Sequence, residues 1–150
     1  MRTTIPMVCL VLLAGFTVAR ADDNARLVKE VAATERAFAA TMAARDHEAF
    51  SRYVAEEAVF FDGMKTLRGK AAIASAWKNY FQHAEAPFSW TPETVVVLDS
   101  GTLAHSSGPV FNSQGKRIST FNSVWRRDSD GVWRVIFDKG CDACACEKAP

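Results

Sequence analysis

The apolar positions recur at helical spacing through the first half of the chain. In the stretch 23–46 they fall at Leu27, Val31, Phe38 and Met42. This spacing predicts an amphipathic helix, and Asp22, Asp23 and Asn24 are candidates for its N-cap. Asp46 is a good N-cap for a second helix over 46–57. The stretch 69–84 repeats the pattern and predicts a third helix.

The second half of the chain favours strands. A short β-prone run at 58–61 is followed, after the third helix, by four β-rich stretches separated by glycine-containing turns, at 88–101, 102–115, 116–131 and 132–140. The residues Asp-Ser-Asp-Gly at 128–131 are a strong hairpin signal between the last two. Helices followed by a meander of strands predict an α+β domain, with three N-terminal helices packed on a curved antiparallel sheet. Such a sheet forms a cone whose open end can hold a small ligand.

The two ends of the chain differ from this domain. Residues 1–21 combine an early Arg2, an apolar stretch and a small-residue site at Ala19–Ala21. This is the layout of a cleavable signal peptide, and the apolar run is shorter than a membrane span requires. We therefore expect an exported protein, periplasmic or secreted, with a domain at 22–140 and a cysteine-containing tail at 141–150. No membrane association is expected after cleavage.

The tail carries three cysteines, Cys141, Cys144 and Cys146. An odd number in an oxidising compartment leaves one thiol outside any internal disulfide. A structural role, a redox role and soft-metal binding all remain open, although a fourth ligand for a tetrahedral site is not evident. Basic and acidic residues nearly balance, with a formal net charge of +1 over the whole chain. Nucleic-acid binding is thus not expected. The sequence contains no histidine–carboxylate cluster for a metal, no phosphate-binding glycine loop and no dinucleotide fingerprint, so no cofactor is expected.

Three segments carry a family resemblance: 45–63, 67–77 and 124–138. With them the chain resembles the nuclear-transport-factor-2-like superfamily, and within it the SnoaL-like, DUF4440 group of small exported domains. The superfamily includes ketosteroid isomerases and polyketide cyclases, but also binding and assembly modules, so the resemblance specifies the fold more than an activity.

The distant resemblance to ketosteroid isomerases implies roles for three positions. Their proton-shuttling aspartate corresponds to Asp62, their enolate-stabilising tyrosine to Phe38, and their protonated aspartic acid roughly to Ser123. One oxyanion donor is therefore missing and the other is reduced to a hydroxyl. Because losing one such donor costs roughly 2.7–4 kcal/mol of transition-state stabilisation, steroid isomerisation is disfavoured.

Asp62 and His105 are the candidate catalytic residues. Asp62 precedes Gly63 and is either a turn residue or a carboxylate at the mouth of a pocket, with Phe60 or Phe61 as a wall. His105 shares strand parity with Leu103 and Ser107, so it either faces the cone and carries a proton or is a structural histidine.

Several further residues are candidates for the pocket. Asp138 ends the last strand and either pairs with Arg126 or Arg134 or lines the cone together with Asp62. Ser123 shares strand parity with Phe121 and Trp125, and if that face is the cone interior, Ser123 supplies a hydroxyl donor among aromatic walls. The expected walls are Phe38, Phe60, Trp77, Phe81, Trp90, Phe121 and Trp125, with a small apolar molecule as the ligand.

Two functions follow from these candidates. The first is cofactor-free acid–base catalysis, of the isomerase, cyclase or hydratase type, on an apolar carbonyl compound. The alternative is a non-catalytic module that binds a hydrophobic ligand or acts as a dimeric accessory protein. In either case we expect a homodimer formed through the exposed face of the sheet.

Overall fold

The computed structural model describes residues 14–142, and side chains within 23–141. Its helices are α1 (Ala14–Ala43), α2 (His47–Tyr53), α3 (Lys70–Trp77) and the short 3-10 helix η1 (Lys78–Phe81). Its strands are β1 (Val54–Asp62), β2 (Lys65–Arg68), β3 (Phe88–Trp90), β4 (Thr94–Val97), β5 (Leu103–Asn112), β6 (Arg117–Arg127) and β7 (Trp133–Asp142). Within this range, no helix combines the length and the apolar character needed to cross a lipid bilayer.

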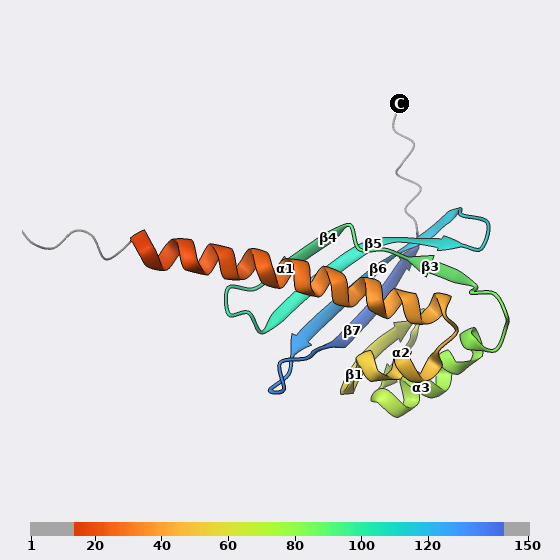
Figure 1. Cartoon of the computed structure of the whole chain (residues 1–150). Coiled ribbons are helices and arrows are strands. Elements are labelled where there is room, and N and C mark those ends of the chain that lie inside the picture. The colour runs from red at the N-terminus through yellow and green to blue at the C-terminus, as the bar shows by residue number, and fades with distance from the viewer. Residues whose placement is uncertain (1–13, 143–150) are drawn as a thin grey trace, which may run out of the picture.

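The strands form one mixed sheet in the order β2-β1-β7-β6-β5-β3, and β4 pairs with β5 alongside β3. All pairs are antiparallel except β1 with β7, which are parallel. α1 lies obliquely across one face of the sheet, and α2 and α3 gather beside the C-terminal end of α1 (Figure 1). The fold is the predicted α+β cone.

The face of the sheet that α1 covers is its inner face, and the core lies between this face and α1. Phe38 of α1 is at its centre, with ring contacts to Phe50, Tyr53, Trp90 and Trp125 at centroid distances of 4.9–5.7 Å. Phe38, Phe50 and Trp125 are almost fully excluded from solvent. Because aromatic rings bury the largest apolar areas, this cluster fixes α1 and α2 against the sheet.

The elements differ from the sequence prediction mainly at their ends. α2 ends at Tyr53, four residues earlier than predicted, because the chain turns into β1 at Val54. The capping role of Asp46 is confirmed: its side chain accepts a hydrogen bond of 2.8 Å from the Ala49 amide. The third predicted helix is divided between α3 and η1. β7 runs to Asp142, so Cys141 is a strand residue rather than part of the tail.

A β-bulge in β7 determines which residues face the core. Val124 of β6 pairs with Phe137, but Trp125 pairs with Val135, so Ile136 is an extra residue. The bulge shifts the alternation: Val135 is fully buried, whereas Phe137 lies on the outer face. The inward direction of Asp138, next to the bulge, follows from this shift, and bulges are common where a side chain is re-aimed beside a site.

Candidate functional site

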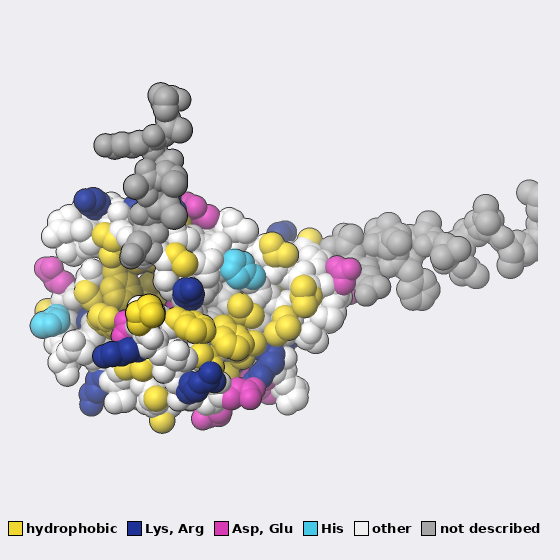
Figure 2. Space-filling view, turned by 180° about the vertical axis from the view of Figure 1, so that it is seen from behind, with side chains coloured by type: hydrophobic (Ala, Val, Ile, Leu, Met, Phe, Trp, Pro, Cys, Tyr) yellow, Lys and Arg dark blue, Asp and Glu magenta, His cyan; other side chains and the backbone are white. Residues whose placement is uncertain are grey.

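A cavity of about 740 Å³ lies at the wide end of the cone. It is enclosed by the C-terminal part of α1, by α3 and η1, by β3, and by the ends of β1, β6 and β7. Its aromatic walls are Phe38, Phe61, Trp77, Tyr80, Phe88, Trp90 and Phe121. A recess lined with hydrophobic side chains is visible at the left of the space-filling view (Figure 2). This size and lining suit a small apolar molecule.

Most of the predicted walls line this cavity. Phe38, Trp77, Trp90 and Phe121 do so, as do Asp62 and Asp138. The predicted walls that do not are Phe60, Phe81 and Trp125, which pack around the cavity as a second layer. Phe60 packs edge-on against Trp77, Phe81 packs against Phe50, and Trp125 lies behind Phe38.

The structure places His105 outside the cavity. Ala104 and Ser106, its neighbours in β5, are buried on the inner face, so strand alternation turns His105 to the outer face. There its paired neighbours are Val96 of β4 and Val124 of β6. His105 shares a face with Leu103 and Ser107, as predicted, but this is the face turned away from α1, so the interpretation that it faces the cone is wrong.

Asp62 lies at the mouth of the cavity. It is the last residue of β1, it is exposed, and it is followed by a turn in which Gly63 has a φ of +57°. Glycine adopts this left-handed conformation without steric cost. Asp62 thus combines both interpretations, because it precedes a turn and also lines the cavity.

Asp138 is the carboxyl group on the inner face of the sheet. It pairs with Phe60 of β1 on one side and with Ser123 of β6 on the other. The hydroxyl of Ser123 donates a hydrogen bond of 2.8 Å to Oδ2 of Asp138. Arg126 and Arg134 instead bind Asp128 and other acidic groups, so the interpretation of Asp138 as their ion-pair partner is wrong.

The pKa of Asp138 is raised to about 7. The main cause is burial, which penalises the charged form, and the negative charge of Glu35 adds to it; the hydrogen bond from Ser123 acts in the opposite direction. An acid with this pKa is present in both protonation states near neutral pH. This is the condition under which one group can accept and return a proton.

Glu35 was not among the candidate residues. It lies on α1, its side chain is fully buried, and it accepts hydrogen bonds from Trp90 Nε1 (2.8 Å), Trp125 Nε1 (2.8 Å) and Ser106 Oγ (2.5 Å). The sequence did contain a signal for it, since Glu35 lies four residues after Val31 on the apolar stripe of the first helix. A charged residue at a core position requires polar partners inside the protein.

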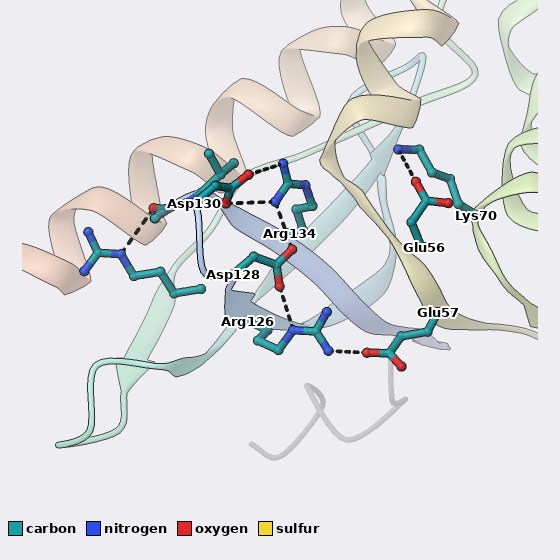
Figure 3. Close-up of polar contacts among 10 residues, drawn as sticks. Glu56, Glu57, Lys70, Arg126, Asp128, Asp130 and Arg134 are labelled. Atoms are coloured by element: carbon teal, nitrogen blue, oxygen red, sulfur yellow. Dashed lines mark hydrogen bonds and ion pairs between the residues drawn. The ribbon is translucent and has the colours of Figure 1, made fainter.

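A second polar cluster lies at the opposite end of β6 and β7 (Figure 3). Arg134 bridges Asp128 and Asp130, and Arg126 bridges Asp128 and Glu57. The pKa of Asp130 is lowered to about 2, and the largest cause is a hydrogen bond from Arg134. These charges pair with one another at the surface, so the cluster is not a candidate for catalysis.

Of the three tail cysteines, only Cys141 lies in the part of the chain that the structure describes. Cys141 is a free, exposed thiol that lines the cavity mouth, whereas Cys144 and Cys146 lie outside the described residues. Among residues 23–141, no group of three or more histidine, cysteine, aspartate or glutamate side chains is arranged to bind a metal ion.

The fold and the cavity define a cone-shaped protein of the nuclear-transport-factor-2-like (NTF2-like) class. The sequence profile of the SnoaL-like domain matches residues 35–136, and the chain belongs to this family. No functionally curated protein matches the chain.

Three solved structures illustrate the fold. An NTF2-like protein of unknown function from Pseudomonas putida KT2440 is 19% identical, with a TM-score of 0.63 over 84% of this chain and 94% of that one. A provisionally assigned dehydratase of the NTF2-like family from Streptomyces avermitilis is 15% identical, with a TM-score of 0.65 over 81% and 99%. A provisionally assigned ketosteroid isomerase from Parabacteroides distasonis is 19% identical, with a TM-score of 0.57 over 71% and 82%. At these identities the likeness concerns the fold.

Proposed function

We propose that this protein binds a small apolar carbonyl compound in its cavity and transfers a proton to and from it without a cofactor. The observation that carries the proposal is the position and pKa of Asp138. Its carboxyl group lines an aromatic cavity, and burial raises its pKa to about 7. The proposal replaces Asp62 with Asp138 as the central acid–base group, because Asp62 is exposed at the mouth.

The chemistry requires only the side chains present. In its ionised form, Asp138 accepts a proton from the carbon next to the carbonyl group, which yields an enolate and a neutral Asp138. Where the compound has a β,γ double bond, return of the proton to the γ-carbon of the resulting dienolate gives the conjugated isomer. Where it does not, the proton on Asp138 exchanges with water, and protonation of the same carbon returns the starting compound with a hydrogen from the solvent. The hydroxyls of Tyr80 and Ser119 line the same cavity and are available to bind the enolate oxygen.

Proton exchange on a simple ketone tests this proposal. We expect the protein to accelerate deuterium uptake from D₂O next to the carbonyl group of 2-tetralone, followed by proton NMR. The rate should rise with pH through a midpoint near 7, as Asp138 ionises. Asp138→Asn should reduce the accelerated rate by about 10²-fold or more, the usual contribution of a general base. Asp62→Asn is the matched control and should retain most of it. Exchange at equal rates with wild type and Asp138→Asn would exclude Asp138 as the base.

A binding module without catalysis is the second candidate, and the continuous aromatic wall favours it. Trp77 and Trp90 both line the cavity, so bound 2-tetralone should change the tryptophan fluorescence. Saturable binding to wild type and Asp138→Asn, with no accelerated exchange in either, would support this second function against the first.

We also propose that the protein acts outside the cytoplasm, after removal of residues 1–21. This proposal rests on the sequence pattern described above, and residues 1–13 lie outside the described range. Residues 14–21 form the first turns of α1, so cleavage after Ala21 would leave a helix that begins at Asp22.

A further inference from the structure

The proposed function leaves one buried charged group without a role. Glu35 is completely excluded from solvent, although it has an ionisable carboxyl. The described residues that donate hydrogen bonds to its oxygens are neutral, two indoles and one hydroxyl. Burial raises the pKa of Glu35, and these donors act against the rise. Burying a glutamate among neutral partners costs free energy of folding, so its position calls for an explanation.

A row of polar residues connects Glu35 to the cavity. Ser106 of β5, Ser123 of β6 and Asp138 of β7 are direct neighbours across the three strands. Ser106 contacts Glu35, and Ser123 contacts Asp138. Ser123 pairs with Ser106, which binds Glu35, on one side and with Asp138 on the other, so it lies between the two carboxyl groups in this row. Its hydroxyl lowers the pKa of both groups.

We propose that Glu35, Ser123 and Asp138 form one proton-holding unit, in which Glu35 is a positioning residue that keeps a proton on Asp138. Two carboxyl groups buried close together do not both ionise readily, so a negative Glu35 favours the neutral form of Asp138. Ser123 orients Oδ2 of Asp138 through its hydrogen bond. Asp138 alone of the three lines the cavity, so the proton is exchanged with a ligand there. The inference rests on the proposed function only for the role of Asp138 toward a ligand.

The other titratable groups around Asp138 differ from Glu35 in their exposure. Asp62 of β1, Tyr80 of η1, and Lys139 and Cys141 of β7 line the same cavity, and all four are exposed. The ammonium group of Lys139 lies over the ring of Phe61, 5.9 Å from its centre. Water screens exposed charges, whereas Glu35 acts on Asp138 through the protein interior. Glu35 is thus the group through which Asp138 is controlled.

The test is the titration of Asp138 in the intact protein, followed through its carboxyl carbon by NMR. Glu35→Gln should lower the midpoint by on the order of one pH unit, because a negative charge is removed. Glu30→Gln is the matched control: Glu30 also lies on α1 and accepts a hydrogen bond from a tryptophan indole, that of Trp133. It should leave the midpoint unchanged. Ser123→Ala should raise the midpoint, because the hydroxyl stabilises the ionised form, and Ser123→Thr should restore it.

Two results would overturn the inference. One is an equal midpoint for Asp138 in Glu35→Gln and Glu30→Gln. The other is a midpoint that falls or stays in Ser123→Ala, which would remove Ser123 from the unit whether or not Glu35→Gln folds. These titrations need no substrate. If Asp138→Asn accelerates deuterium uptake by 2-tetralone as wild type does, while Glu35→Gln lowers the titration midpoint of Asp138, the proposed function fails and the inference holds. If Asp138→Asn abolishes exchange and Glu35→Gln leaves the midpoint unchanged, the inference alone fails.

Discussion

At the scale of single residues, burial makes the stability of the protein depend on the ionisation of two carboxyl groups. The pKa values of Asp138 and Glu35 are both raised, mainly by burial. An acid whose pKa is higher in the folded state binds more protons when folded, so the free energy of unfolding falls as the pH rises. For Asp138 this window runs from about 4, where a free aspartate ionises, to about 7.

We therefore expect the protein to be less stable at pH 8 than at pH 5. The contribution of Asp138 is on the order of 3 kcal/mol. Asp138→Asn should remove most of this loss, because an amide does not ionise; urea unfolding at several pH values measures it. Asp130 acts in the opposite sense: its pKa is lowered to about 2, so its contribution is lost as the pH falls from 4 to 2. A wild type that becomes steadily more stable from pH 5 to 8 would contradict the account.

The candidate residues show what sequence could and could not predict at this scale. Phe38, Trp77, Trp90 and Phe121 line the cavity as predicted, and Asp62 both lies at its mouth and precedes a turn, because hydrophobic pattern and strand ends are local features. Of the two interpretations of His105, the one that faces it into the cone is wrong, since alternation shows which residues share a face but not which face is covered by a helix.

At the scale of elements, the bulge at Ile136 explains the main error in the site. Without it, uninterrupted alternation places Asp138 on the face of Arg134, which suggested an ion pair. The extra residue shifts the remainder of β7 by one position and turns Asp138 inward. A bulge arises from pairing between two strands, so the sequence of one strand does not reveal it. β2 was also missed, because its four residues carry no clear alternation.

A close approach of β5 to the segment before β4 gives a prediction at this scale. A Cβ atom at Gly108 would lie 2.1 Å from the carbonyl oxygen of Thr91, so the backbone would have to move. Gly108→Ala should lower the free energy of unfolding by roughly 1–3 kcal/mol or more. Gly140→Ala is the matched control, because a Cβ atom in that strand meets nothing within 4 Å. Equal denaturant midpoints for the two variants would show that the segment does not pack as closely as described.

At the scale of the whole molecule, the sheet has one face covered by α1 and one that α1 leaves uncovered. Hydrophobic side chains form a band across this outer face (Figure 2). Val96, His105, Val124 and Phe137 are neighbours along it in four adjacent strands. The side chains of Val96 and Phe137 are 56% and 45% exposed. Exposed apolar patches of this kind mark interaction sites.

We expect a second copy of the chain to cover this face, which would give a homodimer. Light scattering during gel filtration should give the mass of a dimer for wild type. Phe137→Lys should shift it to a monomer, because the charge would be buried in the interface. Ile118→Lys is the control for an added charge, since Ile118 is comparably exposed but lies at the cavity end of β6. A monomeric wild type would rule out this assembly.

The measurement that tests the central claim most directly is the titration midpoint of Asp138 in the wild-type protein. Carboxyl carbon shifts recorded from pH 3 to 9, with Asp138→Asn to assign the signal, give it without a substrate. The account predicts a midpoint near 7, set mainly by burial in the aromatic cavity. A midpoint at or below the value of about 3.9 for a free aspartate would mean that the cavity carboxyl stays ionised at neutral pH, and acid–base catalysis by Asp138 would be excluded.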